Sequence, residues 1–330
     1  MSASRSDFRL AILDDYQDVA ATAADWSPLD GRADITVFTG PATKPETTLT
    51  RLAPFDAVVA MRERTAFDRA TIEALPRLKL IATTGARNAA IDLDAARARG
   101  VTVCGTGGGS TATPELAWAL LQSAARHLPA EFASFRSGGW QVSVGRELSG
   151  RTLGLLGLGK IGQAMARYAR AFGMEVLAWS QNLTPGHAAE HGATWVSKED
   201  LLRRSDIVSI HLVLSERTRG LIGAAELALM KPDAILVNTS RGPIVDEAAL
   251  IAALREDRLA GAALDVFDTE PLPAVHPFRT MNKVTATAHI GYVSRENYRQ
   301  MYGQTVENIL AFLNGKPIRL LGDEASWPAK

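Results

Sequence analysis

Three side chains in the C-terminal half carry groups suited to binding an anion and moving a proton. Arg241 and His289 each follow an apolar, strand-like run, and Glu270 lies between them in the sequence. A guanidinium offers a planar fork of donors that can hold a carboxylate and reach a carbonyl oxygen. An imidazole can exchange a proton with such an oxygen, and a carboxylate on its other ring nitrogen fixes the tautomer and favours the charged form. Each residue alone could be structural, but their order at strand ends favours one site.

A series of alternating strands and helices positions these side chains. Because such alternation is typical of parallel sheets covered by helices, it predicts a six-stranded doubly wound sheet that binds ligands at the carboxyl ends of its strands. The expected strands are Thr152–Leu156, Glu175–Trp179, Ile207–Ile210, Ala234–Asn238, Ala262–Val266 and Val284–Thr287.

The first of these strands runs into a Gly-x-Gly-x-x-Gly turn followed by a helical stretch. Gly157 would form the tight turn, Gly159 would let the backbone approach a pyrophosphate, and Gly162 would let the helix pack closely on the strand. The helix N-terminus would supply amides for the phosphates. The pattern therefore predicts a dinucleotide site at Gly157, Gly159, Lys160, Ile161 and Gly162.

The N-terminal part shows a second alternating series, which predicts another parallel α/β sheet. Its expected strands are Phe8–Leu13, Asp34–Phe38, Ala57–Ala60, Leu78–Thr83 and Val101–Val103. A glycine-rich connection from Cys104 to Thr111 follows, and the last helix spans Arg295–Leu313. We expect a discontinuous substrate domain of residues 1–110 and 293–330, a dinucleotide-binding domain of residues 111–292, and a cleft between them.

Composition excludes several classes of partner. The 36 basic residues balance 36 acidic ones, which argues against nucleic acid or an anionic membrane as a partner. No apolar run approaches the roughly 20 residues that span a bilayer. The single cysteine, Cys104, allows no internal disulfide and indicates a cytoplasmic protein. The other histidines lack evident partners, so we interpret them as structural and expect no metal site: His127, His187, His191 and His276.

Several of these motifs together resemble the D-isomer-specific 2-hydroxyacid dehydrogenases, including glyoxylate/hydroxypyruvate reductase and phosphoglycerate dehydrogenase-like members. The resemblance rests on Gly85-Ala86-Arg87-Asn88, the glycine turn, Asn238 to Pro243, Asp265 to Pro271 and His289-Ile290-Gly291. It implies two Rossmann-like or flavodoxin-like domains with doubly wound parallel sheets, and a homodimer formed through Glu115–His127 and Phe132–Trp140. It also implies that Arg241, Glu270 and His289 are the catalytic residues.

The resemblance assigns further binding roles. The Gly85 and Ala86 amides would hold the substrate carboxylate beside Arg241 and His289. Arg62 is a second candidate for this role, although it could equally be a solvated arginine. On the cofactor side, Asp265 would bond the nicotinamide carboxamide, and further contacts would come from His211 through its backbone, Thr239, Ser240, Arg241, His289 and Gly291.

One position departs from the usual dinucleotide pattern. An acidic residue roughly 20 positions beyond the glycine turn normally bonds the adenosine ribose and selects NAD. Here Ser180, Gln181 and Asn182 follow the second strand. No arginine or lysine stands nearby for the extra phosphate of NADP, so the sequence leaves both cofactors open with a slight preference for NAD.

The expected activity is hydride transfer that interconverts a small 2-oxo acid and its D-2-hydroxy acid. Formate dehydrogenases resemble the chain but pair their histidine with glutamine, and Glu270 argues against that chemistry. Oxidation of phosphite or another small anion remains an alternative. A third alternative is a corepressor that senses NAD and binds other proteins, although the balanced charge and the absence of long disordered tails argue against this role.

Overall fold

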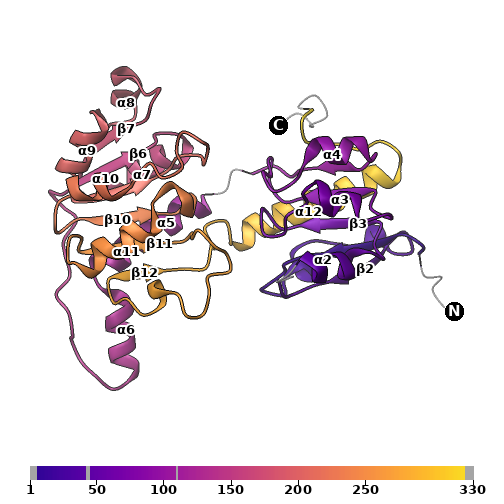
Figure 1. The fold of residues 1–330 in the computed structure, drawn as a ribbon, viewed down its shortest axis with the longest axis horizontal. Coiled ribbons are helices and arrows are strands. Elements are labelled where there is room, and N and C mark those ends of the chain that lie inside the picture. The colour runs from indigo at the N-terminus through magenta and orange to yellow at the C-terminus, as the bar shows by residue number, and fades with distance from the viewer. Residues whose placement is uncertain (1–5, 42–44, 109–110, 324–330) are drawn as a thin grey trace. The chain divides into compact units, whose positions relative to one another are not determined.

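The computed structural model describes residues 6–41, 45–108 and 111–323. The chain divides into two compact units (Figure 1), Met1–Ser110 with Val293–Lys330 and Thr111–Tyr292. Residues 109 and 110 of the glycine-rich connection, and the outer ends of the expected first domain, lie outside the described residues. None of the described helices combines the length and apolar character needed to cross a membrane.

The first unit is built on a five-stranded parallel sheet in the order β2-β1-β3-β4-β5. The order reverses between β1 and β3, which marks a topological switch point. The central strands β3 and β4 are buried throughout, as expected for a sheet covered on both faces. Its elements are β1 (Arg9–Ile12), α1 (Ala20–Ala23), η1 (Ser27–Leu29), β2 (Asp34–Val37), α2 (Pro45–Leu52), β3 (Ala57–Ala60), α3 (Arg69–Glu73), β4 (Leu80–Thr83), α4 (Leu93–Ala98), β5 (Thr102–Cys104) and α12 (Arg295–Leu313).

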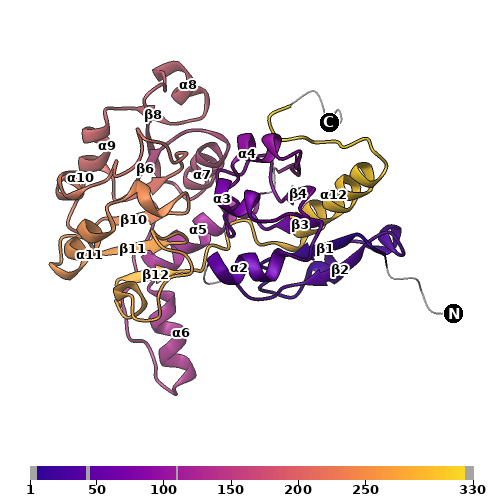
Figure 2. The same ribbon diagram turned by 45° about the vertical axis from the view of Figure 1, so that its right-hand side comes forward.

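The C-terminal helix α12 packs on this first sheet, as Figure 2 shows. It begins after Ser294, whose hydroxyl accepts a hydrogen bond from the Asn297 amide. The Asn308 side chain then donates to the Gly105 carbonyl at 2.7 Å, and the Gly105 amide donates to the Arg319 carbonyl at 2.8 Å. These bonds hold the segment after α12 beside β5.

The second unit contains a seven-stranded sheet in the order β12-β11-β10-β9-β6-β7-β8, with parallel pairing throughout. Its elements are α5 (Ala112–Ala125), α6 (Leu128–Arg136), β6 (Thr152–Leu156), α7 (Lys160–Ala171), β7 (Glu175–Trp179), α8 (Pro185–Glu190), β8 (Thr194–Trp195), α9 (Lys198–Arg204), β9 (Ile207–Ile210), α10 (Ala224–Leu229), β10 (Ile235–Asn238), η2 (Gly242–Ile244), α11 (Glu247–Arg255), β11 (Gly261–Leu264), η3 (Pro277–Arg279) and β12 (Val284–Ala286).

The α/β class with two parallel sheets is therefore confirmed, but the expected number of six strands is wrong. The seventh strand, β8, has two residues, both exposed, at the edge of the sheet. A short exposed strand carries no apolar run, so its sequence lacks the pattern that marks the other six.

Helices cover both faces of this sheet. Leu153 and Leu155 of β6 pack into one core, and Leu156 packs into the other. At Gly154 a Cβ atom would lie 2.5 Å from a methyl carbon of Leu201, so α9 approaches β6 more closely than any side chain there would allow. This packing sets the position of β6, the strand that leads into the glycine turn.

Candidate active site

The glycine turn after β6 has the geometry of a phosphate-binding loop. Gly157 has a φ of +102°, and a Cβ there would lie 2.5 Å from the His211 carbonyl oxygen. A Cβ at Gly162 would lie 2.1 Å from the Gly157 oxygen, whereas one at Gly159 would meet nothing within 4 Å. Protein packing thus requires glycine at the first and third positions, while the second opens onto free space that suits an approaching pyrophosphate.

Helix α7 begins directly at this turn, with Gly159 as its N-cap and no side-chain capping bond. The amides of its first turn have no helical acceptors, because the helix starts there. Together with the partial positive charge of the helix N-terminus, these amides form an anion site. The turn and the helix therefore fit the phosphates of a dinucleotide.

Glu270 and His289 form a hydrogen-bonded pair. The Nδ1 atom of His289 lies 2.5 Å from Oε2 of Glu270, and the other carboxylate oxygen accepts the Phe267 amide at 2.9 Å. The imidazole also meets the Tyr292 ring edge-on, with the ring centroids 6.0 Å apart. The His289 side chain is 24% exposed, and its Nε2 makes no hydrogen bond with any described residue. One ring nitrogen is thus held by a carboxylate while the other is available to a ligand.

Asp265 organises the segment that carries His289. It is 1% exposed, and its carboxylate accepts the Thr287 hydroxyl at 2.6 Å, the Ile290 amide at 2.8 Å and the Gly291 amide at 2.7 Å. Burial raises the pKa of Asp265, and these hydrogen bonds oppose that shift. The carboxylate therefore holds both sides of His289, which has the left-handed φ of +53°. The sequence did not single out Thr287 for this support.

Arg241 leaves β10 on a loop that Asn238 holds. The Asn238 side chain donates to the Arg241 carbonyl and accepts the Ser240 amide, both at 3.0 Å, while the Ser240 hydroxyl donates to the Ile210 carbonyl at 2.8 Å. Thr239 is buried, and its hydroxyl has no partner among the described residues. The sequence did not predict this role of the Asn238 side chain. The signal for it was a polar amide side chain at the end of a buried apolar strand.

The Arg241 loop also touches the loop that carries Glu270. A Cβ at Gly242 would lie 2.1 Å from the carbonyl carbon of Phe267, so only glycine allows the two backbones to come this close. Because β10, β11 and β12 are neighbours in the parallel sheet, their carboxyl ends share one edge. Arg241, Glu270 and His289 follow these three strands in turn.

In the first unit, the substrate candidates follow the neighbouring strands β3 and β4. The Arg62 amide donates to the Thr84 hydroxyl at 2.9 Å, and a Cβ at Gly85 would lie 2.0 Å from a guanidinium nitrogen of Arg62. The structure brings these two together. However, the Gly85 amide already donates to the Thr106 hydroxyl at 2.7 Å. The expectation that this amide is available to the substrate carboxylate is therefore wrong. Ala86 is exposed, and its amide has no acceptor among the described residues.

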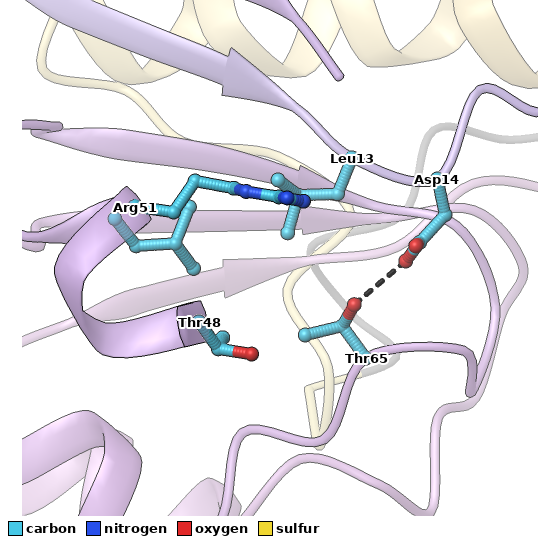
Figure 3. Close-up of a pocket in the computed structure, with 6 residues that line it drawn as sticks. Leu13, Asp14, Thr48, Arg51 and Thr65 are labelled. Atoms are coloured by element: carbon cyan, nitrogen blue, oxygen red, sulfur yellow. Dashed lines mark hydrogen bonds between the residues drawn. The ribbon is translucent and has the colours of Figure 1, made fainter. Parts of the chain in front are cut away.

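A second polar group in the first unit lies at the end of β1 (Figure 3). There Thr65 donates to the Asp14 carboxylate at 2.6 Å, and burial raises the pKa of Asp14. Arg51 lies nearby, with its guanidinium 5.0 Å from the centre of the Phe38 ring. The pocket has no room for a water-sized sphere. The Asp14 carboxylate already accepts a hydrogen bond from Thr65, so this pocket is poorly suited to binding a ligand.

The remaining histidines are better partnered than the sequence suggested. His276 lies 3.0 Å from a Glu247 oxygen, and His187 lies 3.5 Å from a Glu190 oxygen and stacks edge-on with His191. The expectation that His187, His191 and His276 lack partners is therefore wrong. Potential ligand atoms of His187, Glu190 and His191 lie within 4.8 Å of one another at the C-terminal end of α8, where His187 and Glu190 are exposed and His191 is half-buried.

Two other groups are unsuited to acid–base or nucleophilic catalysis. Burial lowers the pKa of His211 to about 3, so this ring is neutral at ordinary pH; its Nε2 lies 2.9 Å from the Ser209 hydroxyl. The His211 carbonyl borders the glycine turn. Burial raises the pKa of Cys104 to about 12, which leaves this thiol protonated and inert.

The adenosine side of the site departs from expectation. Ser180, Gln181 and Asn182 follow β7 as expected, but Arg217 from the loop after β9 donates to the Gln181 side-chain oxygen at 3.3 Å. The expectation that no cation lies near these residues is therefore wrong. Arg217 stands 36 positions further along the chain, so no residue close to the end of β7 in the sequence signals it.

This sheet order, the glycine turn and the hydrogen-bonded pair of His289 and Glu270 are those expected of an α/β oxidoreductase that binds a dinucleotide. The sequence model of the D-isomer specific 2-hydroxyacid dehydrogenase NAD binding domain matches residues 118–291, within the second unit. The chain is 43% identical over 251 residues to a glyoxylate reductase of Aeropyrum pernix, covering 73% of this chain and 75% of that one.

Other relatives carry a different substrate in their names. A D-3-phosphoglycerate dehydrogenase of Archaeoglobus fulgidus is 36% identical over 82% of this chain, which spans only 52% of that protein. The crystal structure of a phosphoglycerate oxidoreductase from Vibrio cholerae matches with a TM-score of 0.89 at 36% identity, covering 93% of this chain and 99% of the other. The chain belongs to the D-isomer specific 2-hydroxyacid dehydrogenase family. It is an enzyme that interconverts 2-oxo acids and 2-hydroxy acids.

Proposed function

We propose that the enzyme reduces a small 2-oxo acid of the glyoxylate type to the D-2-hydroxy acid, or runs the reverse reaction, with His289 as the proton donor. The pairing of His289 Nδ1 with Glu270, which leaves Nε2 available, carries this proposal. Bound at the glycine turn, the dinucleotide supplies or accepts the hydride. In reduction, Nε2 of the charged imidazole donates the proton that the developing alkoxide requires.

The substrate carboxylate is the anion that the remaining groups would bind. Arg241 presents a fork of donors that can hold it and reach the reacting oxygen. Arg62 and the Ala86 amide of the first unit are further candidates for this carboxylate. We assign dinucleotide binding to the second unit, because the phosphate-binding turn lies there, and we propose that the first unit contributes to substrate binding through Arg62 and Ala86.

The cofactor and the location of the enzyme are also inferred. We propose that both NAD and NADP are accepted, because no carboxylate follows β7 to repel the extra phosphate of NADP. A cytoplasmic location fits a chain whose single cysteine is buried and unpaired, and fractionation of cells that express the protein would test it.

Turnover tests the proposal directly. Glyoxylate, hydroxypyruvate and phosphohydroxypyruvate should be offered with NADH and with NADPH, and we expect reduction of at least the smallest acid. Oxidation of phosphite without reduction of any 2-oxo acid would instead favour a small-anion dehydrogenase. Binding of NADH with no turnover of either kind would favour a sensor that acts by binding other proteins.

Replacing Glu270 with glutamine tests the acid–base pair. The carboxylate bonds Nδ1 of His289 and so fixes the orientation of the ring, which leaves Nε2 available to the substrate. Glutamine keeps the size of the side chain but loses the charge-assisted bond, so kcat/KM for 2-oxo-acid reduction should fall by about 10-fold or more. Steady-state kinetics of the parent and of Glu270→Gln measure the change.

A matched control is Glu247→Gln, which removes the carboxylate beside the other paired histidine, His276. It should leave kcat/KM for 2-oxo-acid reduction within about twofold of the parent. If Glu270→Gln also leaves kcat/KM unchanged, Glu270 does not hold His289 for proton transfer.

We also propose that a second copy of the chain covers the exposed apolar side chains around α6. No described residue of this helix is buried, and Figures 1 and 2 show it projecting from the second unit. Phe135 is 71% exposed and Trp140 is 75% exposed. A groove of about 460 Å³ runs beside the helix, lined in part by Pro129, Val144 and Lys283. Exposed apolar patches of this kind mark protein interfaces.

Light scattering at micromolar concentration should give twice the 35.4 kDa mass of one chain. The double variant Phe132→Glu, Phe135→Glu should shift the protein to monomer, because it places charges where apolar contact is needed. Val275→Glu, at a side chain that is 93% exposed in the same unit, should not. A monomeric parent contradicts the proposal.

A further inference from the structure

Arg217 reaches the adenosine end of the dinucleotide site from a separate loop. The strands β7 and β9 lie on either side of β6, so the loops that follow them flank the glycine turn. The Arg217 guanidinium donates to the Gln181 side-chain oxygen at 3.3 Å, which joins these two loops. The start of the β9 loop is already fixed against the turn, since a Cβ at Gly157 would lie 2.5 Å from the His211 oxygen.

The loop that carries Arg217 is ordered by its own hydrogen bonds. The Thr218 hydroxyl donates to the Val213 carbonyl at 2.7 Å and accepts the Ser215 amide at 2.8 Å. The Arg219 amide donates to the Ser215 carbonyl at 2.9 Å. These bonds close the backbone turn that carries Arg217, whose side chain is exposed and therefore open to an incoming ligand.

The charge of Arg217 is uncompensated. Within the described part of the chain it forms no ion pair, and its hydrogen-bond partner is the neutral amide of Gln181. In this fold the residues at the end of the second strand face the 2′ position of the adenosine ribose, where NAD carries a hydroxyl and NADP a phosphate. Ser180, Gln181 and Asn182 put no negative charge there.

We propose that Arg217, together with Ser180 and Gln181, holds the 2′-phosphate of NADP and NADPH. The inference rests on the proposed dinucleotide site and adds which form of the cofactor it selects. A guanidinium binds phosphate through paired, charge-assisted hydrogen bonds, whereas the ribose hydroxyls of NAD find no carboxylate at this position. This proposal of a preference for NADP differs from the slight preference for NAD that the sequence suggested.

Fragment binding tests the site without requiring turnover. Calorimetry on the full chain should show that 2′,5′-ADP binds more tightly than 5′-AMP, and that Arg217→Ala weakens 2′,5′-ADP by about 10- to 100-fold while leaving 5′-AMP nearly unchanged. Arg219→Ala is the matched control, because it removes the same charge from the same turn. Ser180→Asp should also weaken 2′,5′-ADP, by repulsion of the phosphate.

A kinetic measurement tests the same site. With a 2-oxo acid as substrate, Arg217→Ala should lower kcat/KM for NADPH and leave kcat/KM for NADH unchanged. Equal affinity of the parent for the two fragments would overturn the proposal, and so would an equal loss in Arg219→Ala. If the fragments are discriminated as expected but no 2-oxo acid is reduced with either cofactor, the phosphate site stands and the proposed reaction fails.

Discussion

His289→Ala should lower the rate of 2-oxo-acid reduction by about 10² to 10⁴-fold, the usual effect of removing a positioned proton donor. The substitution leaves the alkoxide without a proton source, since the Nε2 atom that faces away from Glu270 is lost with the ring. Stopped-flow measurement of NADPH or NADH oxidation gives the chemical step, and cofactor binding measured separately should change little.

His276→Ala is the control for this variant, because His276 also pairs with a carboxylate, that of Glu247, at 3.0 Å. We expect less than about tenfold loss from it, because both of its ring nitrogens are already engaged: Nε2 lies 3.0 Å from Glu247, and Nδ1 accepts the Phe278 amide at 3.3 Å. If the two variants lose activity equally, pairing of a histidine with a carboxylate does not identify the acid of this enzyme.

Arg241→Lys should lower kcat/KM for the 2-oxo acid by about 100-fold. The lysine keeps the positive charge but offers a single ammonium instead of a planar fork, so the carboxylate and the reacting oxygen are no longer held together. Because ground state and transition state both lose this contact, the change should include a rise in KM. Steady-state kinetics over a range of glyoxylate concentrations measures both parameters.

Arg219→Lys serves as the control, since Arg219 lies on the turn beside Arg217 rather than at the end of β10. It should leave kcat/KM for the acid within about twofold of the parent, as is usual for a substitution that touches no substrate. Unchanged kcat/KM in Arg241→Lys would show that the substrate carboxylate is bound elsewhere, with Arg62 of the first unit as the next candidate.

The two parallel sheets and the glycine turn could be predicted from the sequence alone. Parallel strands covered on both faces are continuous apolar runs, so β6, β9 and β10 stand out between polar helical segments. The turn after β6 is equally local, because the close approaches at Gly157 and Gly162 admit only glycine. The order of Arg241, Glu270 and His289 at strand ends likewise follows from where each apolar run stops.

The partners of the polar side chains were decided only by the tertiary structure. Asp265 takes two amides and a hydroxyl from the segment after β12, the Gly85 amide is taken by Thr106, and Arg217 meets Gln181. Each contact joins loops that follow different strands, so it depends on the spatial order of those strands. Apolar periodicity records which face of an element is buried, but it does not record which neighbouring loop supplies a hydrogen-bond partner.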